Sequence, residues 1–305
     1  MDPLSEYARR RVEQTVAVHD TDPIPKVAEA GSVVERDGRR VQVMHNGALV
    51  EAGAYHGDWM IEVIQRLRGH HEPQEELAFH TVLERLAEDT PEPVMVELGA
   101  FWAYYSIWAK RRIPGARLVL VEPDRANLEV GRRNLELNDF TGTFVEAGVG
   151  AAHDARVPIR WDSDGRQHLV RAVSVDGLIA ELELAAVDLL LIDVQGAELD
   201  TLRGAARALA DRRLRFLVVS THHHSISGDP LMHQRCLRLL VQAGAHIVAE
   251  HSIRESCSGD GLIVASMSEV DRDLHAEVSI VRARDSLWGE SELELADALG
   301  VRGLD

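Results

Sequence analysis

The sequence has little cysteine and no long apolar run, and both absences narrow the class of protein. Only two cysteines, Cys236 and Cys257, occur in 305 residues. This number is too small for a disulfide framework and indicates a reducing compartment. No apolar run approaches the ~18 residues that span a membrane. The charged N-terminus also lacks the apolar core of a secretory signal. We therefore expect a cytoplasmic protein with no membrane partner.

Positive charge is scarce as well. Lys and Arg total 33 against 50 Asp and Glu, which gives a net charge of −17. Such a surface repels phosphate backbones, so we expect no nucleic-acid partner. The sequence shows no internal repeat and no low-complexity segment. Its 45% hydrophobic content is ordinary for a globular protein, and the length suits one large domain or two small ones.

Short apolar segments alternate with amphipathic helical patterns from residue 94 onward. This alternation predicts an α/β fold built on a doubly wound, mostly parallel seven-stranded sheet. The last two strands have no helix between them, which predicts an antiparallel hairpin at the sheet edge. The expected strands are 94–97, 117–121, 143–147, 188–192, 215–220, 246–250 and 261–266.

The chain outside these strands predicts three further parts. Residues 1–70 are expected to form an N-terminal α+β extension, with a β-hairpin at 32–50 that turns at Asp37 and Gly38. We expect this extension to act as a lid that contributes to the substrate site, and not to fold independently. Residues 71–270 would form the main domain, and 271–305 an acidic tail that is helical near 290–298.

A strand–turn–helix at 94–112 is the first candidate for a binding site. The apolar strand runs into Glu97, a turn follows at Gly99, and a helix begins near residue 103. This geometry places backbone N–H groups at the carboxyl end of a strand, where open α/β sheets bind nucleotides. Glu122 ends the next strand, where a carboxylate can accept hydrogen bonds from ribose hydroxyls. By position, Ala147 after the third strand would border adenine.

Asp193 follows the expected strand at 188–192, and a run of three histidines at 222–224 follows the expected strand at 215–220. Asp193 could bind a cofactor ammonium, act as a general base or ligate a metal; the alternative is a helix cap. Glu198 is expected to be structural, because an acid suits the first turn of a helix. His222 and His223 offer imidazoles that can take a proton from an alcohol, and the alternative is a polar loop. Asp193 and His222 could together hold a divalent metal ion.

Several of these segments resemble the FkbM group of S-adenosylmethionine (SAM)-dependent methyltransferases. The resemblance covers roughly residues 90 to 266, and the segment Ile-Asp-Val-Gln-Gly-Ala-Glu at 192–198 is its most specific part. It implies a Rossmann-like class I methyltransferase fold with SAM as cofactor. Phe101 and Trp102 stand where small residues are often found, which disfavours a dinucleotide because pyrophosphate needs bare backbone. The expected SAM-binding residues are Glu75, Glu97, Gly99, Phe101, Tyr105, Ser106, Glu122, Ala147 and Asp193.

The resemblance implies a SAM-dependent O-methyltransferase that acts on a hydroxyl of a small molecule, such as a sugar, a polyketide-type scaffold or another secondary metabolite. His222 is the first choice of base, with Asp193 orienting it or sharing a metal with it. His70, His71, Glu72 and Glu75 could close over the cofactor, or could form an ordinary acidic first helical turn. Two other functions remain open, an NAD-linked oxidoreductase and a non-catalytic ligand-binding module. The oligomeric state is open too, with a homo-oligomer among the possible forms.

Overall fold

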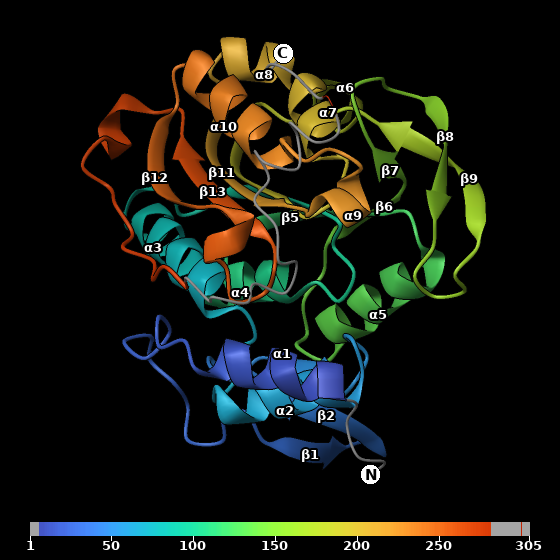
Figure 1. Cartoon of the computed structure of the whole chain (residues 1–305), viewed down its shortest axis with the longest axis vertical. Coiled ribbons are helices and arrows are strands. Elements are labelled where there is room, and N and C mark those ends of the chain that lie inside the picture. Colours follow the sequence, from blue (N-terminus) through green and yellow to red (C-terminus); the bar gives the residue numbers. More distant parts are fainter. Residues whose placement is uncertain (1–5, 282–299, 301–305) are drawn as a thin grey trace.

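The computed structural model describes residues 6–281 and residue 300. The chain forms an upper α/β body and a lower body made of the N-terminal extension, which meet along one face (Figure 1). The helix expected near 290–298 lies outside the described residues. Among the residues described, no helix combines the length and apolar character needed to cross a membrane.

The central sheet has seven strands in the order β12-β13-β11-β10-β4-β5-β6. The pairs among β11, β10, β4, β5 and β6 are parallel, whereas β13 is antiparallel to both β11 and β12. The predicted sheet and its antiparallel edge hairpin are therefore confirmed. The strands are β4 (Val94–Leu98), β5 (Arg117–Glu122), β6 (Thr143–Glu146), β10 (Val187–Ile192), β11 (Leu214–Thr221), β12 (His246–His251) and β13 (Gly261–Ser266).

Helices cover both faces of the sheet (Figure 1). Side chains of β10 alternate between two cores: Leu189 and Leu191 face one, while Leu190 and Ile192 face the other. This burial on both sides explains why the strand is a continuous apolar run. One face carries α3 (Pro73–Asp89), α4 (Tyr104–Arg112) and α5 (Arg125–Glu136); the other carries α6 (Val175–Glu181), α7 (Glu198–Arg203), α8 (Ala206–Ala210) and α10 (Met232–Gln242).

The N-terminal extension shares its core with the main domain. Val50 and Met60 belong to the same buried cluster as Phe79 of α3 and Ile107 of α4, so the extension and the main domain bury apolar side chains together. The division at residue 70 falls in the linker before α3. The predicted hairpin is present. The elements are α1 (Glu6–Val16), β1 (Val33–Arg36), β2 (Arg39–Val43), β3 (Leu49–Glu51) and α2 (Asp58–Arg66), with β1, β2 and β3 forming an antiparallel sheet.

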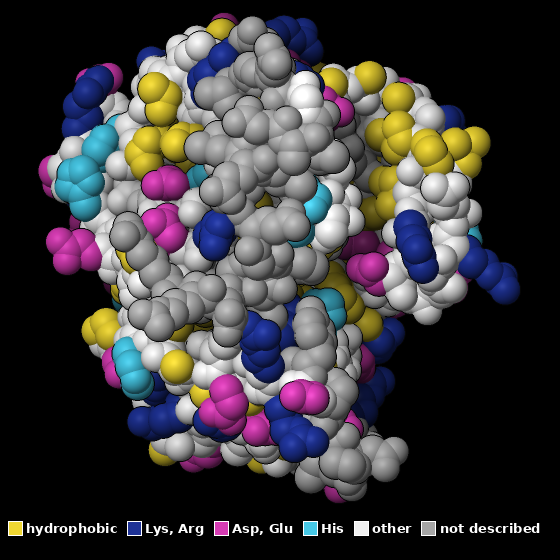
Figure 2. Space-filling view, viewed as in Figure 1, with side chains coloured by type: hydrophobic (Ala, Val, Ile, Leu, Met, Phe, Trp, Pro, Cys, Tyr) yellow, Lys and Arg dark blue, Asp and Glu magenta, His cyan; other side chains and the backbone are white. Residues whose placement is uncertain are grey.

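An excursion between β6 and α6 forms a third sheet, in the order β7-β9-β8. Its strands are β7 (Gly148–Val149), β8 (Ala155–Arg160) and β9 (Gln167–Val173). Figure 2 shows hydrophobic side chains at the upper right, where Figure 1 places β8 and β9. Leu169 on β9 is 66% exposed. The remaining elements are the short α9 (His224–Ser227) and two 3₁₀ turns, η1 (Ile253–Glu255) and η2 (Glu269–Asp271).

Candidate active site

A cavity of about 580 Å³ opens where the carboxyl ends of β4, β5 and β10 meet. The extension supplies part of its wall through residues 54–57, and the excursion supplies another part through residues 159–163. The sheet therefore provides the floor of the cavity, while two segments outside it form the sides. This is the edge at which open α/β sheets bind ligands.

Gly99 brings the ends of β4 and β10 together. Its φ is +82°, and a Cβ at this position would lie 1.7 Å from the carbonyl oxygen of Asp193. The Asp193 N–H in turn donates to the Leu98 carbonyl at 3.0 Å. Because a side chain would meet rigid backbone, only glycine fits here. The turn thus fixes the distance between the two strand ends that face the cavity.

Glu97 faces the cavity from the end of β4. Its carboxylate is 3% exposed and accepts hydrogen bonds from the N–H and the hydroxyl of Ser106. Burial raises the pKa of Glu97 to about 8, although the Ser106 bonds act in the opposite direction. Among the described residues, no Lys, Arg or His forms an ion pair with Glu97. A buried carboxylate without a cationic partner is suited to bind an ammonium group from a ligand.

Glu122 faces the same cavity from the end of β5. It accepts hydrogen bonds from the Phe101 N–H at 3.2 Å and the Asp124 N–H at 2.9 Å. Burial raises the pKa of Glu122 to about 7. The bond to Phe101 also holds the turn, in which Phe101 and Ala103 both adopt positive φ. Glu122 therefore shapes the cavity and leaves a carboxylate facing it.

The other expected cofactor residues take different places. Tyr105 and Ala147 line the cavity, as do Gly99, Phe101 and Asp193. Ser106 and Glu75 do not line it: Ser106 holds Glu97, and Glu75 accepts a hydrogen bond from the Ser220 hydroxyl. Trp161 and Asp162 of the excursion line the cavity as well, and no motif in the sequence points to them. They had no detectable signal, because their position depends on how the excursion folds back over the sheet.

A second cavity of about 180 Å³ adjoins the first. It lies between the extension and the sheet edge, with α1 and α2 on one side and the end of β11 on the other. Asp193 and Gln195 line both cavities. The other residues that line both are Tyr55, His56, His71 and Glu72. The shared wall means that groups in the two cavities can face each other.

His222 lines the second cavity and is 2% exposed. Its Nδ1 lies 2.7 Å from Glu198 Oε1, and its Nε2 lies 3.4 Å from Asp193 Oδ1. The Gln195 amide nitrogen is 2.8 Å from the same Nε2. Burial alone would lower the pKa of His222, but the carboxylates of Asp260, Glu198 and Asp193 raise it well above its ordinary value. Burial raises the pKa of Asp193 to about 6.

Glu198 stands at the start of a helix, as expected, and also contacts His222. It is fully buried at the start of α7, and its carboxylate accepts the Nδ1 hydrogen of His222. This bond fixes which imidazole nitrogen carries a hydrogen and points the other toward the cavity. The only signal in the sequence was an acidic residue near a strand end. Its partner lies 24 residues away in the chain, so spacing could not reveal the pair.

His223 and His224 lie apart from both cavities. The Nδ1 of His223 accepts the Ser225 N–H at 3.2 Å and caps α9, and its ring contacts that of His224 at a centroid distance of 3.9 Å. Burial, with a smaller contribution from His224, lowers the pKa of His223 to about 4. The histidine run therefore places one imidazole, His222, at the cavity wall.

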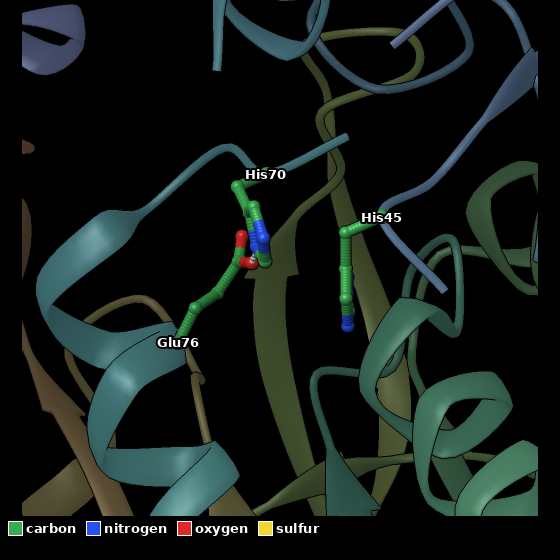
Figure 3. Close-up of side chains that lie close together, drawn as sticks. All are labelled: His45, His70 and Glu76. Carbon is green, nitrogen blue, oxygen red and sulfur yellow. Dashed lines mark hydrogen bonds and ion pairs between the residues drawn. The ribbon is translucent and has the colours of Figure 1, made fainter. Parts of the chain in front are cut away.

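A group of three possible metal ligands occurs elsewhere among the described residues. His45, His70 and Glu76 are buried with ligand atoms within 4.8 Å of one another (Figure 3). The rings of His45 and His70 stack at a centroid distance of 4.2 Å and an angle of 16°. Imidazole binds a metal through a lone pair in the ring plane, so two parallel stacked rings do not converge on one ion. The cluster acts as a hydrogen-bonded contact between the extension and α3.

The chain is similar to several solved structures at low sequence identity. The chain resembles the precorrin-6y C5,15-methyltransferase of Geobacter metallireducens GS-15 at 18% identity, over 63% of this chain and 88% of that one, with a TM-score of 0.39. It resembles cofactor-bound Rv0187 from MTB at 17% identity, over 63% and 79%, with a TM-score of 0.43. It also resembles the N-terminal domain of human METTL16 in complex with SAH at 15% identity, over 65% and 71%, with a TM-score of 0.41.

No protein of curated function matches the chain. The model of the methyltransferase FkbM domain matches residues 51–247, which is more than half of the chain. This match confirms the resemblance drawn from the sequence, and it sets aside the NAD-linked alternative. On the strength of this domain match, the chain belongs to the FkbM family of SAM-dependent methyltransferases.

Proposed function

We propose that this protein transfers the methyl group of SAM to a hydroxyl of a small molecule. SAM would occupy the larger cavity and the acceptor the smaller one. The observation that carries this proposal is the wall shared by the two cavities, where Asp193 stands within 3.4 Å of the buried His222. A methyl group that reaches this wall from one side can meet a nucleophile on the other.

The larger cavity offers a group for each part of SAM. The Glu97 carboxylate would pair with the ammonium of the methionine part, because it is buried and has no cation of its own among the described residues. Glu122 would accept hydrogen bonds from the ribose hydroxyls. Ala147 and Trp161 also line the cavity, and the adenine would lie against them. These assignments agree with the order expected along the carboxyl edge of the sheet.

His222 would act as the general base. When bound, SAM would supply a methyl group on its sulfonium sulfur; the acceptor oxygen would take this methyl carbon as its bond to sulfur breaks, which would leave S-adenosylhomocysteine. The proton of the hydroxyl passes to His222 Nε2, while Glu198 holds the imidazole through Nδ1. The methyl group already sits on a good leaving group, so alignment supplies much of the catalysis. Asp193 stabilises the imidazolium that forms, from 3.4 Å.

The N-terminal extension would close the site. Residues 54–57 line the larger cavity, and Arg11 and Trp59 line the smaller one. Truncation of the extension would expose both cavities to water. A closed active site keeps water away from the reacting groups. The net charge of −17 supports a small-molecule acceptor over a nucleic acid.

A divalent metal held by Asp193 and His222 is the alternative means of activating the hydroxyl. Asp260 Oδ1 lies 3.8 Å from His222 Nε2 and could complete such a site. The Glu198 bond leaves Nε2 as the ligand nitrogen. Metal analysis of the purified protein, and activity after treatment with a chelator, distinguish this mechanism from proton transfer to His222.

The function is tested with labelled SAM and a panel of small hydroxylated acceptors. We expect methyl transfer to oxygen, identified by mass spectrometry of the product. His222→Ala should reduce the rate by roughly 10²-fold or more and leave SAM affinity nearly unchanged. If the protein binds SAM while no acceptor in the panel is methylated, a ligand-binding module explains the site better. Methyl transfer to nitrogen instead would contradict the proposal.

A further inference from the structure

We propose that the acceptor carries a protonated amine beside the hydroxyl that is methylated, an inference that rests on the proposed function. The acceptor would be a compact amino alcohol, such as an amino sugar or an aminocyclitol. Its hydroxyl would face His222 and Asp193, and its ammonium would face the carboxylates on the remaining wall of the smaller cavity.

Three carboxylates from separate elements line the smaller cavity. Glu72 precedes α3, Asp193 follows β10, and Asp260 precedes β13. They are 121 and 67 residues apart in sequence (193 − 72 and 260 − 193), so tertiary packing alone brings them together. Side chains of Asp193 and Asp260 are only 32% and 29% exposed. Like charges gathered at one partly buried wall repel each other unless a cation joins them.

The cations among the described residues balance only part of this charge. Arg11 lines the cavity, but its guanidinium donates to the Ser258 carbonyl at 3.4 Å and lies 4.8 Å from the centre of the Trp59 ring. His222 Nε2 lies 3.4 Å from Asp193 and 3.8 Å from Asp260, but its Nδ1 already pairs with Glu198, so a single imidazole faces three carboxylates. Among the described residues, neither Glu72 nor Asp260 forms an ion pair with Lys or Arg. A ligand ammonium with three N–H donors would satisfy these oxygens.

The electrostatics of Glu72 agree with a missing cation. Its pKa is raised well above the usual value by burial and then by the charges of Glu75, Asp260 and Asp193. A cationic ligand would reverse this shift. Neutral hydroxyl groups could also bond to the carboxylates, but they would not remove the repulsion between them.

The size of the cavity restricts the acceptor. A volume of about 180 Å³ equals that of about six water molecules at ~30 Å³ each. This space accommodates one small ring or a short chain. Tyr55 and Trp59 provide apolar wall against which the carbon face of such a ring can pack. A larger acceptor would place only its amine-bearing end in the cavity.

The test uses matched pairs of probes that differ only in charge. A panel of amino sugars and aminocyclitols, each with its N-acetyl twin, is titrated by calorimetry into full-length protein loaded with S-adenosylhomocysteine. We expect at least one amine to bind tenfold or more tightly than its twin, with the difference shrinking as salt rises. If no amine in the panel binds better than its twin, the inference is wrong.

Two variants test the carboxylates. Asp260→Asn and Glu72→Gln should each reduce the preference for the amine over its twin by about tenfold. Asp260 lines only the smaller cavity, so its variant should retain the SAM affinity of the natural sequence. Glu35→Gln, at an exposed position of β1, is the matched control and should change nothing. An unaltered preference in both site variants would also overturn the inference.

Assays of methyl transfer distinguish a failure of this inference from a failure of the proposed function on which it rests. Efficient O-methylation of neutral acceptors, without preference for amines, would support the proposed function. It would contradict the inference that the acceptor carries a protonated amine. Tight binding of amines without any methyl transfer would preserve the recognition of charge and count against O-methyl transfer.

Discussion

The Nδ1 of His222 lies 2.7 Å from Oε1 of Glu198, and both side chains are buried. A carboxylate can only accept here, so Nδ1 carries the hydrogen and Nε2 is left to face the cavity. In the same way as the acid of a hydrolase triad, the buried carboxylate of Glu198 fixes the tautomer of the imidazole and makes it a stronger base. The charge of Glu198 should therefore influence the pH at which His222 loses its proton.

Glu198→Gln should shift the pH dependence of methyl transfer. The carboxylates of Asp260, Glu198 and Asp193 raise the pKa of His222, and the base must be unprotonated to accept a proton. The rate should therefore rise with pH, and the rise should move to lower pH when the Glu198 charge is removed. We expect a maximal rate lowered about 10-fold to 100-fold. A pH–rate profile with an unmoved limb would assign Glu198 a purely structural role.

Glu97→Gln should weaken SAM binding and stabilise the ligand-free protein. The amide retains an oxygen for the Ser106 donors but loses the charge that pairs with an ammonium, so affinity should fall about 10-fold to 100-fold. Because the folded-state pKa is raised to about 8, this carboxyl costs stability as pH rises from its unfolded value through 8. At pH 9 the variant should gain roughly 1–3 kcal/mol. Calorimetry and urea unfolding measure both effects; unchanged SAM affinity would contradict the assignment.

SAM binding should release protons near neutral pH. Glu97 is largely protonated in the ligand-free protein below pH 8, and Glu122 is partly so because its pKa is about 7. An ammonium and ribose hydroxyls favour the ionised forms, so SAM affinity should increase as pH rises from 6 to about 8. Titrations in buffers of different ionisation enthalpy count the protons. In Glu97→Gln the release should shrink to the part due to Glu122; proton uptake in either protein would refute the scheme.

Gly99→Ala should be far more damaging than Gly38→Ala. Both glycines have positive φ, but a Cβ at Gly99 meets the Asp193 carbonyl at 1.7 Å, whereas nothing lies within 4 Å of one at Gly38. The Gly38 change should cost about 1 kcal/mol for backbone strain alone. The Gly99 change should cost roughly 3 kcal/mol or more and separate the strand ends. Chemical denaturation compares the two, and equal losses would show that the contact with Asp193 relaxes easily.

Glu76→Gln should loosen the extension from the main domain. The Glu76 carboxylate accepts hydrogen bonds from the His70 ring, the His71 N–H at 2.7 Å and the Tyr104 hydroxyl at 3.2 Å. An amide cannot accept all of these, so we expect a loss of about 2–4 kcal/mol.

The matched control for Glu76 is Glu84→Gln on the same helix. Glu84 pairs with Arg112 at the surface, where an ion pair contributes only about 0.5 kcal/mol. Urea unfolding compares the two variants. Limited proteolysis should cleave the linker near residue 70 faster in Glu76→Gln. Equal stability of the two variants would mean that the buried cluster does not hold the extension in place.

The sequence by itself determined the sheet and the positions of Glu97, Glu122 and Asp193 at its edge. Apolar runs, turn residues and the alternation of strands and helices are local patterns, and parallel strands end at one edge whatever surrounds them. The same local patterns place the histidine run at the end of β11. They do not show which of its imidazoles faces the cavity.

Tertiary structure alone decided the rest of the site. The Glu198–His222 pair, the second cavity, and the wall that Tyr55 and Trp161 complete from opposite sides join segments far apart in the chain. Such contacts depend on how the extension and the excursion pack against the sheet, and packing leaves no periodic signal in any one segment. The sequence therefore determined which edge of the sheet carries the candidate site, and the fold decided which groups line its cavities.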